Sequence, residues 1–255
     1  MTLGKKSRIV FILCASGLFT LVMILQALPP IRAAGPWYVA PDGDDGNDCL
    51  SPGAPCATIN GALGKASPGD TIYVAVGTYT STGDEVVLLD KDATLSGGWD
   101  ETFTDQIGTS SIDGEQSRGG ITVDSGVTAI INWITVQNGF VGIYNYGSLT
   151  LSNTTISGNT DHGICNDGSL TMNNSTVSAN TAYLGGGIYN MATLTLNNST
   201  LSGNTAGYKG GGIYNSSGSA NLNNSTVTGN MASSEGGGHL QSIRHLVPEQ
   251  QHHHW

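Results

Sequence analysis

A repeat of 21 to 26 residues limits what this chain can fold into more than any other feature. The segment GIYNYGSLTLSNTTISGNT begins at Gly142 and returns in altered form at Gly163, Gly187 and Gly212, and a further copy opens at Gly238. The steps between these glycines are 21, 24, 25 and 26 residues. A period in this range indicates stacked supersecondary units, each of which buries its apolar face against its neighbours.

The apolar residues inside each copy follow a period of two. Runs such as SLTLSN and TLTLNN are four to six residues long and end at Gly, Asn or Ser. Such alternation is typical of a strand with one buried face, and no longer stretch has the 3.6-residue period of a helix. Three short strands per repeat predict an all-β solenoid, a parallel β-helix in which each coil pairs with the next.

Asparagines recur at three places in the repeat. Asn tolerates the left-handed conformation at a corner of the coil, and its side-chain amide can bond to the Asn above and below. We therefore interpret these residues as structural columns. The three sets are Asn145, Asn166, Asn190 and Asn215; Asn153, Asn174, Asn198 and Asn224; and Asn159, Asn180, Asn204 and Asn230.

The repeats differ in length mainly at one place. The connections between the Asn159-type residue and the next GIYN read TDH, TAYLGG, TAGYKGG and MASSEGG. Insertions in a solenoid collect on one loop face, which is often the face that binds a partner.

The repeat GGGIYN…LTLNNSTLSGNT resembles those of secreted right-handed parallel β-helix proteins with a pectin-lyase-like fold. It is especially similar to the repeats of polymorphic outer-membrane proteins. The resemblance covers about residues 37–238 and implies a right-handed β-helix of about six coils over residues 71–238. This fold carries lyases, hydrolases, adhesins and inert stalks, so the resemblance alone assigns no activity.

Residues 35–70 are expected to form an N-terminal cap over the open end of the coils. WYV at Trp37 reads as a short strand. Apolar residues then recur at helical spacing from Ile59 to Ala66, with Thr58 as the N-cap and Pro68 ending the helix.

The cap also holds Cys49 and Cys56, seven positions apart. In an exported protein such a pair predicts a disulfide, and a metal site would need more ligands than this loop offers. Cys165 replaces the Tyr of GIYN, so we expect an unpaired thiol stacked between Tyr144 and Tyr189.

Residues 1–34 have the features of an export segment. Lys5, Lys6 and Arg8 precede the apolar run Ile9–Leu28, and the small residues Ala33, Ala34 and Gly35 follow it. The run is long enough that an uncleaved signal anchor stays an alternative to a cleaved signal peptide. Either reading predicts a secreted or cell-surface bacterial protein that contacts the membrane only through this segment.

The charge of the chain is unevenly distributed. The net charge is −10, and the first 34 residues carry four basic and no acidic residues. The remainder therefore has 9 − 4 = 5 basic and 19 acidic residues, a net charge of −14. Such an acidic body disfavours nucleic acid and anionic membranes as partners, and leaves glycans or surface proteins as the expected ones.

No catalytic residue is assigned in the repeats. Between Gly119 and Gly238 the only basic residue is Lys209, and the acids are not matched from coil to coil as a hydrolase would need. We therefore favour a non-catalytic stalk or adhesin. The alternative is a polysaccharide lyase or glycoside hydrolase with its site in the irregular early coils, around Asp90, Asp92, Asp100, Asp105 and Asp113.

Two acidic loops are further candidates for a functional role. The loop 99–109 is the longest insertion among the early coils and is the best candidate there for a functional loop. The cap loop DGDDGND is a candidate Ca²⁺ site, because hard cations prefer clustered carboxylates, with a solvated turn as the alternative. Its candidate ligands are Asp42, Asp44, Asp45 and Asp48, and no other cofactor is expected.

Residues 239–255, HLQSIRHLVPEQQHHHW, depart from the repeat. Codons permitted for these residues, read one base along, allow IYN-x-SGTLSLNNSTITG, which is the missing repeat. We therefore interpret the tail as out-of-frame translation, from a frameshift or a sequencing error, and the chain as a truncated or frameshifted copy of a longer protein. The histidines of the tail are given no functional role.

The nucleotide sequence tests this interpretation. We expect a single-base shift near the His239 codon in the gene as sequenced, followed by an open frame that encodes further repeats. Independent isolates that keep the frame for HLQSIRHLV would contradict it.

Overall fold

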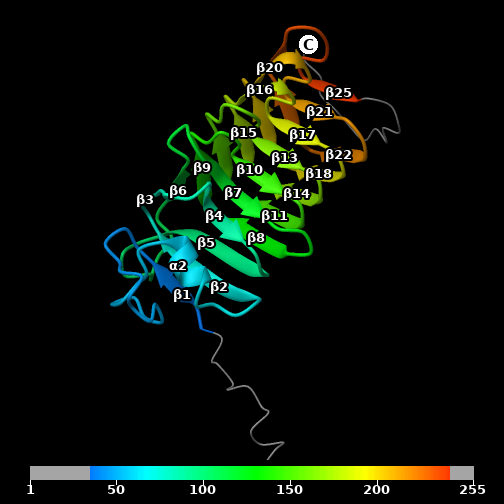
Figure 1. Cartoon of the computed structure of the whole chain (residues 1–255). Helices are drawn as coiled ribbons and strands as arrows, with labels where there is room; N and C mark the ends of the chain where they lie inside the picture. The colour runs from blue at the N-terminus through cyan, green and yellow to red at the C-terminus, as the bar shows by residue number, and fades with distance from the viewer. Residues whose placement is uncertain (1–34, 242–255) are drawn as a thin grey trace, which may run out of the picture. The chain divides into compact units, whose positions relative to one another are not determined.

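A computed structural model describes residues 35–241, which form a solenoid of parallel strands (Figure 1). Every paired strand in the three long sheets runs parallel to its neighbour, so the fold is a parallel β-helix as predicted. Each coil passes through the three long sheets, here called sheets A, B and C, in that order.

Sheet A contains β1 (Trp37–Val39), β2 (Asp70–Ala75), β5 (Ala93–Trp99), β8 (Thr128–Asn132), β11 (Ser148–Ser152), β14 (Ser169–Asn173), β18 (Thr193–Asn197) and β22 (Ser219–Asn223). Sheet B contains β3 (Thr78–Tyr79), β6 (Ser110–Asp113), β9 (Ile134–Gln137), β12 (Thr155–Ser157), β15 (Thr176–Ser178), β19 (Thr200–Ser202) and β23 (Thr226–Thr228). Sheet C contains β4 (Glu85–Leu89), β7 (Gly119–Val123), β10 (Ile143–Asn145), β13 (Ile164–Asn166), β17 (Ile188–Asn190), β21 (Ile213–Asn215) and β25 (His239–Gln241).

A fourth, smaller sheet D lies in the connections between sheets B and C. It consists of β16 (Thr181–Leu184), β20 (Thr205–Lys209) and β24 (Met231–Ala232). These strands are the length variations between repeats, which therefore pair with one another instead of forming separate loops.

The solenoid has about seven turns, one more than the sequence pattern suggested. The difference arises in the early coils, where Thr78–Tyr79 forms the two-residue strand β3. A strand this short has no detectable periodicity, so the sequence pattern predicts a single turn from residue 71 to residue 99. The segment holds one complete turn and the first strand of the next.

The core is a set of columns in which like residues stack. Ile143, Ile164, Ile188 and Ile213 pair in register along sheet C and are fully buried. Leu and Met form equivalent columns along sheet A. Complete burial of each such side chain contributes about 1.5–3 kcal/mol, so every coil adds its own share to a continuous apolar core.

Two of the three asparagine sets form hydrogen-bonded columns in the interior. Along sheet C, Nδ2 of Asn145 donates to Oδ1 of Asn166 at 2.7 Å, and Asn166 to Asn190 at 2.6 Å. At the corner after sheet B, Nδ2 of Asn159 donates to Oδ1 of Asn180 at 2.8 Å. The side chains in both columns are buried except at the C-terminal Asn230.

The third set serves the backbone. Asn153, Asn174, Asn198 and Asn224 have φ between 48° and 51° at the corner between sheets A and B. Asn is among the few non-glycine residues that tolerate this left-handed conformation, so each coil turns the corner at a single residue.

Each repeat opens with a glycine because the backbones of neighbouring coils approach closely at this position. A Cβ on Gly142 would lie 2.5 Å from the carbonyl oxygen of Gly163, and one on Gly187 would lie 2.5 Å from that of Gly212. Any side chain here would force neighbouring coils apart and break the hydrogen bonds between them.

The N-terminal cap agrees with its prediction except in the length of its helix. β1 pairs with β2, and Thr58 is the N-cap of α2 (Ile59–Leu63), accepting from the backbone N–H of Gly61. The helix ends at Leu63, before the predicted stop, and its apolar face is buried against the solenoid.

The predicted disulfide between Cys49 and Cys56 is present, and both residues are fully buried. It closes the cap loop beside β1, whose Tyr38 forms backbone hydrogen bonds to both cysteines.

Two predictions concern segments at the ends of the chain. The export segment, residues 1–34, lies outside the described residues, as does the tail from residue 242. Among the residues described, no helix is long and apolar enough to span a membrane.

Of the tail, β25 pairs with β21, and the register puts His239 opposite Ile213. An imidazole thus replaces an isoleucine of the core column, while the frameshift itself stays a prediction.

Asn180→Ala tests the interior asparagine columns. Oδ1 of Asn180 accepts from both the backbone nitrogen and Nδ2 of Asn159, so its removal leaves two buried donors without an acceptor. We expect a loss of about 2–4 kcal/mol in the free energy of unfolding, measured by urea denaturation followed by circular dichroism. Asn223→Ala is the matched control, because Asn223 makes the same type of bond at the exposed surface. Its loss should stay below about 0.5 kcal/mol, and equal losses in the two variants would contradict the prediction.

Candidate functional site

The three edges of the solenoid differ in the length of the connections between their strands. The edge between sheets A and B turns at one left-handed residue in the regular repeats. The edge between sheets B and C holds the longer connections and sheet D. We call it the variable edge, and it is where the sequence pointed to a binding face.

A polar hollow lies at the N-terminal end of the variable edge, between the cap helix and the first two connections. Its volume is about 470 Å³. It is lined mainly by hydroxyl, amide and charged side chains: Thr58, Asn60, Thr80, Ser81, Thr82, Val86, Glu115 and Arg118. A smaller hollow of about 310 Å³ adjoins it on the other side of Asn60.

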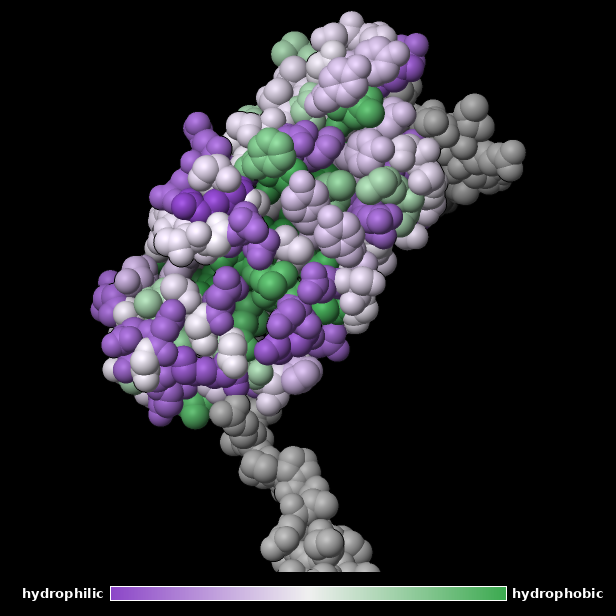
Figure 2. Space-filling view, in the orientation of Figure 1, coloured by the Kyte–Doolittle hydropathy of each residue, from purple (hydrophilic) through white to green (hydrophobic). Residues whose placement is uncertain are grey.

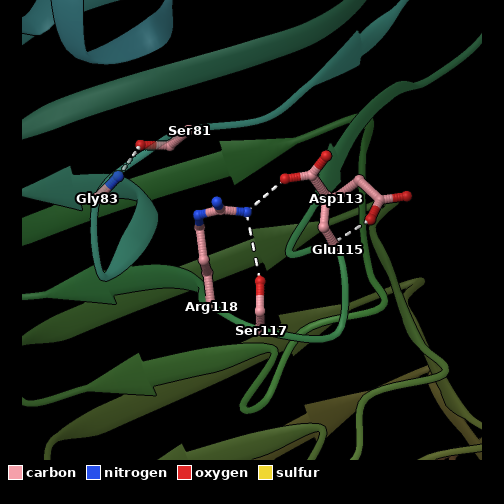
Figure 3. Close-up of polar contacts among 6 residues, drawn as sticks. All are labelled: Ser81, Gly83, Asp113, Glu115, Ser117 and Arg118. Carbon is pink, nitrogen blue, oxygen red and sulfur yellow. Dashed lines mark hydrogen bonds and ion pairs between the residues drawn. The ribbon is translucent and has the colours of Figure 1, made fainter.

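Arg118 is the only arginine in the part of the chain that the structure describes. Its Nη1 forms an ion pair with Glu115 and contacts the hydroxyl of Ser117 at 3.4 Å (Figure 3). Its Nε and Nη2 make no hydrogen bond to any residue between 35 and 241. The guanidinium group could therefore also bind an oxygen ligand in the hollow.

The five early-coil aspartates of the enzyme alternative do not come together. Asp90 and Asp92 lie between sheets C and A, and Asp100 and Asp105 lie between sheets A and B. Asp113 ends β6, at the corner between sheets B and C. The set is therefore distributed over all three edges of the solenoid.

Three of these aspartates accept hydrogen bonds that stabilise the local fold. Asp92 accepts from the backbone N–H of Thr128 at 2.7 Å. Asp113 accepts from the side-chain amides of Gln137 and Asn138 and from the backbone of Glu115, and these bonds lower its pKa despite partial burial. Hydrogen bonds from Thr102 and Thr104 lower the pKa of Asp100 to about 2.

The acidic insertion that includes Asp100 has a packing role. It folds back over the outer surface of sheet A, where Phe103 is buried against Tyr38 at 4.9 Å between ring centroids. Tyr73 stacks on Trp99 at 4.5 Å in the same cluster. The loop singled out by its length and charge thus covers an aromatic cluster.

The candidate Ca²⁺ ligands of the cap are also engaged locally. Asp45 accepts from the backbone nitrogen and the hydroxyl of Thr58 at 2.9 and 2.7 Å. Asp44 and Asp48 each accept a backbone N–H two residues further on, which is the geometry of a turn. Within residues 35–241, no three His, Cys, Asp or Glu side chains are grouped as metal ligands would be. The site with Asp42, Asp44, Asp45 and Asp48 stays a prediction.

Sequence reasoning missed the exposed Trp133 on the edge between sheets A and B. Trp133 occupies the corner position of Asn153 in the next coil, with φ 56°, although a bulky residue is strained in this conformation. Its side chain is exposed, as are those of Val76, Ile107 and Ile130. Alignment of NWITVQ with the repeat segment SNTTIS would have found it, because Trp133 then falls on the position that Asn153 occupies in the repeat.

The outer surface of sheet C carries a column of aromatic residues. Tyr144, Cys165, Tyr189 and Tyr214 pair in register, so Cys165 lies between two tyrosines as the sequence predicted. Cys165 is the only free cysteine among the described residues, and burial, with Asp167 and Asp161 nearby, raises the pKa of its thiol to about 11.

Comparison with known proteins supports the fold and its handedness. The family model "Right handed beta helix region" matches residues 83–240. Among solved structures, pectate lyase Pel9A aligns with a TM-score of 0.54 and 20% identity, over 74% of this chain and 52% of the lyase. A rhamnogalacturonan lyase aligns with a TM-score of 0.31 and 11% identity, over 74% and 62%.

The family model and the alignment with pectate lyase establish the architecture and leave the activity open. The chain spans about half of the pectate lyase, and at 20% identity the match describes the fold alone. A comparison with curated protein sequences gives no significant match.

The raised pKa of Cys165 predicts slow thiol chemistry. Near pH 8 a thiol with a pKa of about 11 is about one-thousandth thiolate, against about a quarter for an ordinary cysteine. We expect an aromatic disulfide reagent to react about two orders of magnitude more slowly with the folded protein than with the urea-unfolded protein. The rate should increase with pH up to about 11. Cys165→Ser gives the background from Cys14, and an equal rate in the folded and unfolded proteins would contradict the prediction.

Proposed function

The chain belongs to the right-handed β-helix family, and on that premise we propose that it is a non-catalytic protein of the cell surface or extracellular space. In this proposal residues 1–34 direct export, and the solenoid is a stalk or adhesin whose variable edge meets glycans or surface proteins. Its repeats resemble those of polymorphic outer-membrane proteins, and it is a frameshifted copy of a longer protein of that type.

The observation that carries the proposal is the separation of the ionisable groups. The five early aspartates lie on three different edges, and three of them accept hydrogen bonds that stabilise the local fold. Hydrolysis of a glycoside requires two carboxyl groups within about 5–10 Å of one another across one bond. Asp100 and Asp105 do share an edge and both contact the hydroxyl of Thr104, at 3.1 and 3.5 Å, but Asp100 there accepts the hydrogen bonds from Thr102 and Thr104 that hold the turn. The arrangement supports a structural role for these residues.

The basic residues support the same proposal. Lys91 donates to the carbonyl of Leu63, and Lys209 forms an ion pair with Glu235 at 3.0 Å. Lys65 donates to the carbonyl of Asp45 within the cap. A lyase needs a base poised beside its substrate. Each of these lysines instead contacts a neighbouring part of the fold.

One observation favours the alternative, a carbohydrate-active enzyme. Arg118 adjoins Glu115 in a hollow that hydroxyl groups line, and two of its guanidinium nitrogens are available to a ligand. This is the place among the early coils where a lyase or hydrolase would act. Arg118 is therefore the residue by which the two functions can be separated.

An activity assay distinguishes the two functions. The purified chain is incubated with a panel of acidic and neutral polysaccharides, with and without Ca²⁺, and assayed for unsaturated products and new reducing ends. We expect no turnover by the wild-type protein. Any turnover would overturn the non-catalytic proposal, and its loss in Arg118→Ala would assign the activity to the hollow.

Protease treatment of intact producing cells tests the surface location. It should degrade the protein, and full protection would contradict that location.

A further inference from the structure

Trp133 occupies a corner between sheets A and B at which the regular coils have asparagine, as at Asn153. The backbone at this corner is the ordinary one. Its φ is 56°, its N–H donates to the carbonyl of Ser152, and its carbonyl accepts from the N–H of Ser110. Only the side chain differs, and a bulky side chain is strained in the left-handed conformation. The fold alone would therefore favour asparagine at residue 133.

The packing of Trp133 does not explain its presence. The side chain is 39% exposed and belongs to neither of the two hydrophobic clusters of the described residues. Its indole N–H forms no hydrogen bond, and its ring no aromatic contact, with any residue between 35 and 241. Strained residues that the fold does not require occur mostly at functional sites, and tryptophan is enriched at the centres of protein–protein interfaces.

Two further apolar side chains adjoin Trp133, one from each of the two preceding connections between sheets A and B. Val76 is 41% exposed and Ile107 is 68% exposed. A Cβ on Gly98 would lie 3.4 Å from Cβ of Trp133, and the N–H of Ile107 donates to the carbonyl of Gly98 at 2.8 Å. A Cβ on Gly108 would lie 3.6 Å from Cγ2 of Val76. We call Val76, Ile107 and Trp133 the tryptophan surface.

The charges beside the tryptophan surface are all negative. The insertion that ends at Ile107 carries Asp100, Glu101 and Asp105, and the last two are exposed. Hydrogen bonds from Thr102 and Thr104 lower the pKa of Asp100 to about 2, so it is ionised at neutral pH. Within residues 35–241, no lysine or arginine lies in a connection between sheets A and B. The surface therefore combines exposed apolar groups with carboxylates that have no basic neighbour on the same edge.

The surroundings restrict the partner further. Residues 42–115 contain 14 acidic and 2 basic residues, a net charge of 2 − 14 = −12. Figure 2 shows strongly hydrophilic side chains gathered over the N-terminal end, where α2, β1 and β2 lie in Figure 1. A second copy of this chain or an anionic membrane would be repelled by this charge, whereas a cationic partner would be attracted.

We propose that the tryptophan surface is a docking site for a basic, amphipathic segment of a partner protein. Apolar side chains of the segment pack on Trp133 and Ile107, and its lysines or arginines pair with Glu101 and Asp105. The indole N–H is available to a carbonyl oxygen of the segment. The inference goes beyond the proposed function, which places the contacts of the protein on the variable edge.

Calorimetric titration of the full chain with a synthetic helical peptide tests the proposal. The peptide has leucines on one face and lysines on the other, and the same peptide with glutamate in place of lysine is the charge control. We expect the lysine peptide to bind, with an affinity that decreases as salt is added, and the glutamate peptide not to bind. Trp133→Asn should weaken binding at least about tenfold. Glu101→Gln/Asp105→Asn should weaken it and reduce its dependence on salt.

Trp133→Asn also separates binding from folding, because asparagine suits this corner. Its melting temperature, followed by circular dichroism, should equal or exceed that of the wild type. A lower melting temperature would assign Trp133 a structural role and overturn the proposal. Tyr183→Ser is the matched control, since it removes a 66% exposed aromatic ring from the variable edge and should leave binding unchanged.

Three binding results would also overturn the proposal. They are no binding of the lysine peptide, equal binding of the glutamate peptide, and binding that Trp133→Asn does not weaken or that Tyr183→Ser weakens equally. Binding of phosphatidylcholine vesicles through Trp133, without binding of the peptide, would assign the surface to a membrane and refute a protein partner. Turnover of polysaccharides tests the non-catalytic function separately, so either proposal can fail without the other.

Discussion

The fold depends on the contact between each residue and its own counterpart one coil away. Nothing larger than hydrogen fits between Gly142 and the carbonyl of Gly163, and the buried amide of Asn180 accepts from the side chain of Asn159 and donates to that of Asn204 in the two adjacent coils. Coils of the same sequence, stacked in parallel, place glycine opposite glycine and asparagine opposite asparagine. One sequence position therefore constrains the whole column, and the larger length changes of the repeat are confined to the variable edge.

The regular part of the fold was predictable because its signals are repeated, and the parts that were missed occur once. The apolar alternation and the asparagines at the positions of Asn145 and Asn159 occur in four copies of the repeat. The repeat could not show that Asn153 bends the backbone while Asn159 bonds to its neighbours, because the same residue type serves both purposes. The two-residue strand β3 and the pairing of the connections into sheet D have no sequence period to reveal them.

The candidate sites show the same limit more strongly. The aspartates from Asp90 to Asp113 are close in sequence, and only the path of the coil shows that they lie on different edges. Arg118 and its hollow depend on how the cap helix meets the first connections, which no local pattern describes. The tyrosines of GIYN were visible as a repeat, but their exposure followed only from knowing that the Ile and Asn beside them point inward.

The interior asparagine columns also have a direction. In both columns Nδ2 donates toward the C-terminal coil, and backbone groups fix this orientation, since the backbone N–H of Asn159 donates to Oδ1 of Asn180 and that of Gly147 to Oδ1 of Asn145. The amide dipoles are therefore aligned and reinforce one another along the stack. A chain emerging from its N-terminus would thus present, at each completed coil, donors already oriented toward the next, so that the solenoid acts as a template for its own elongation.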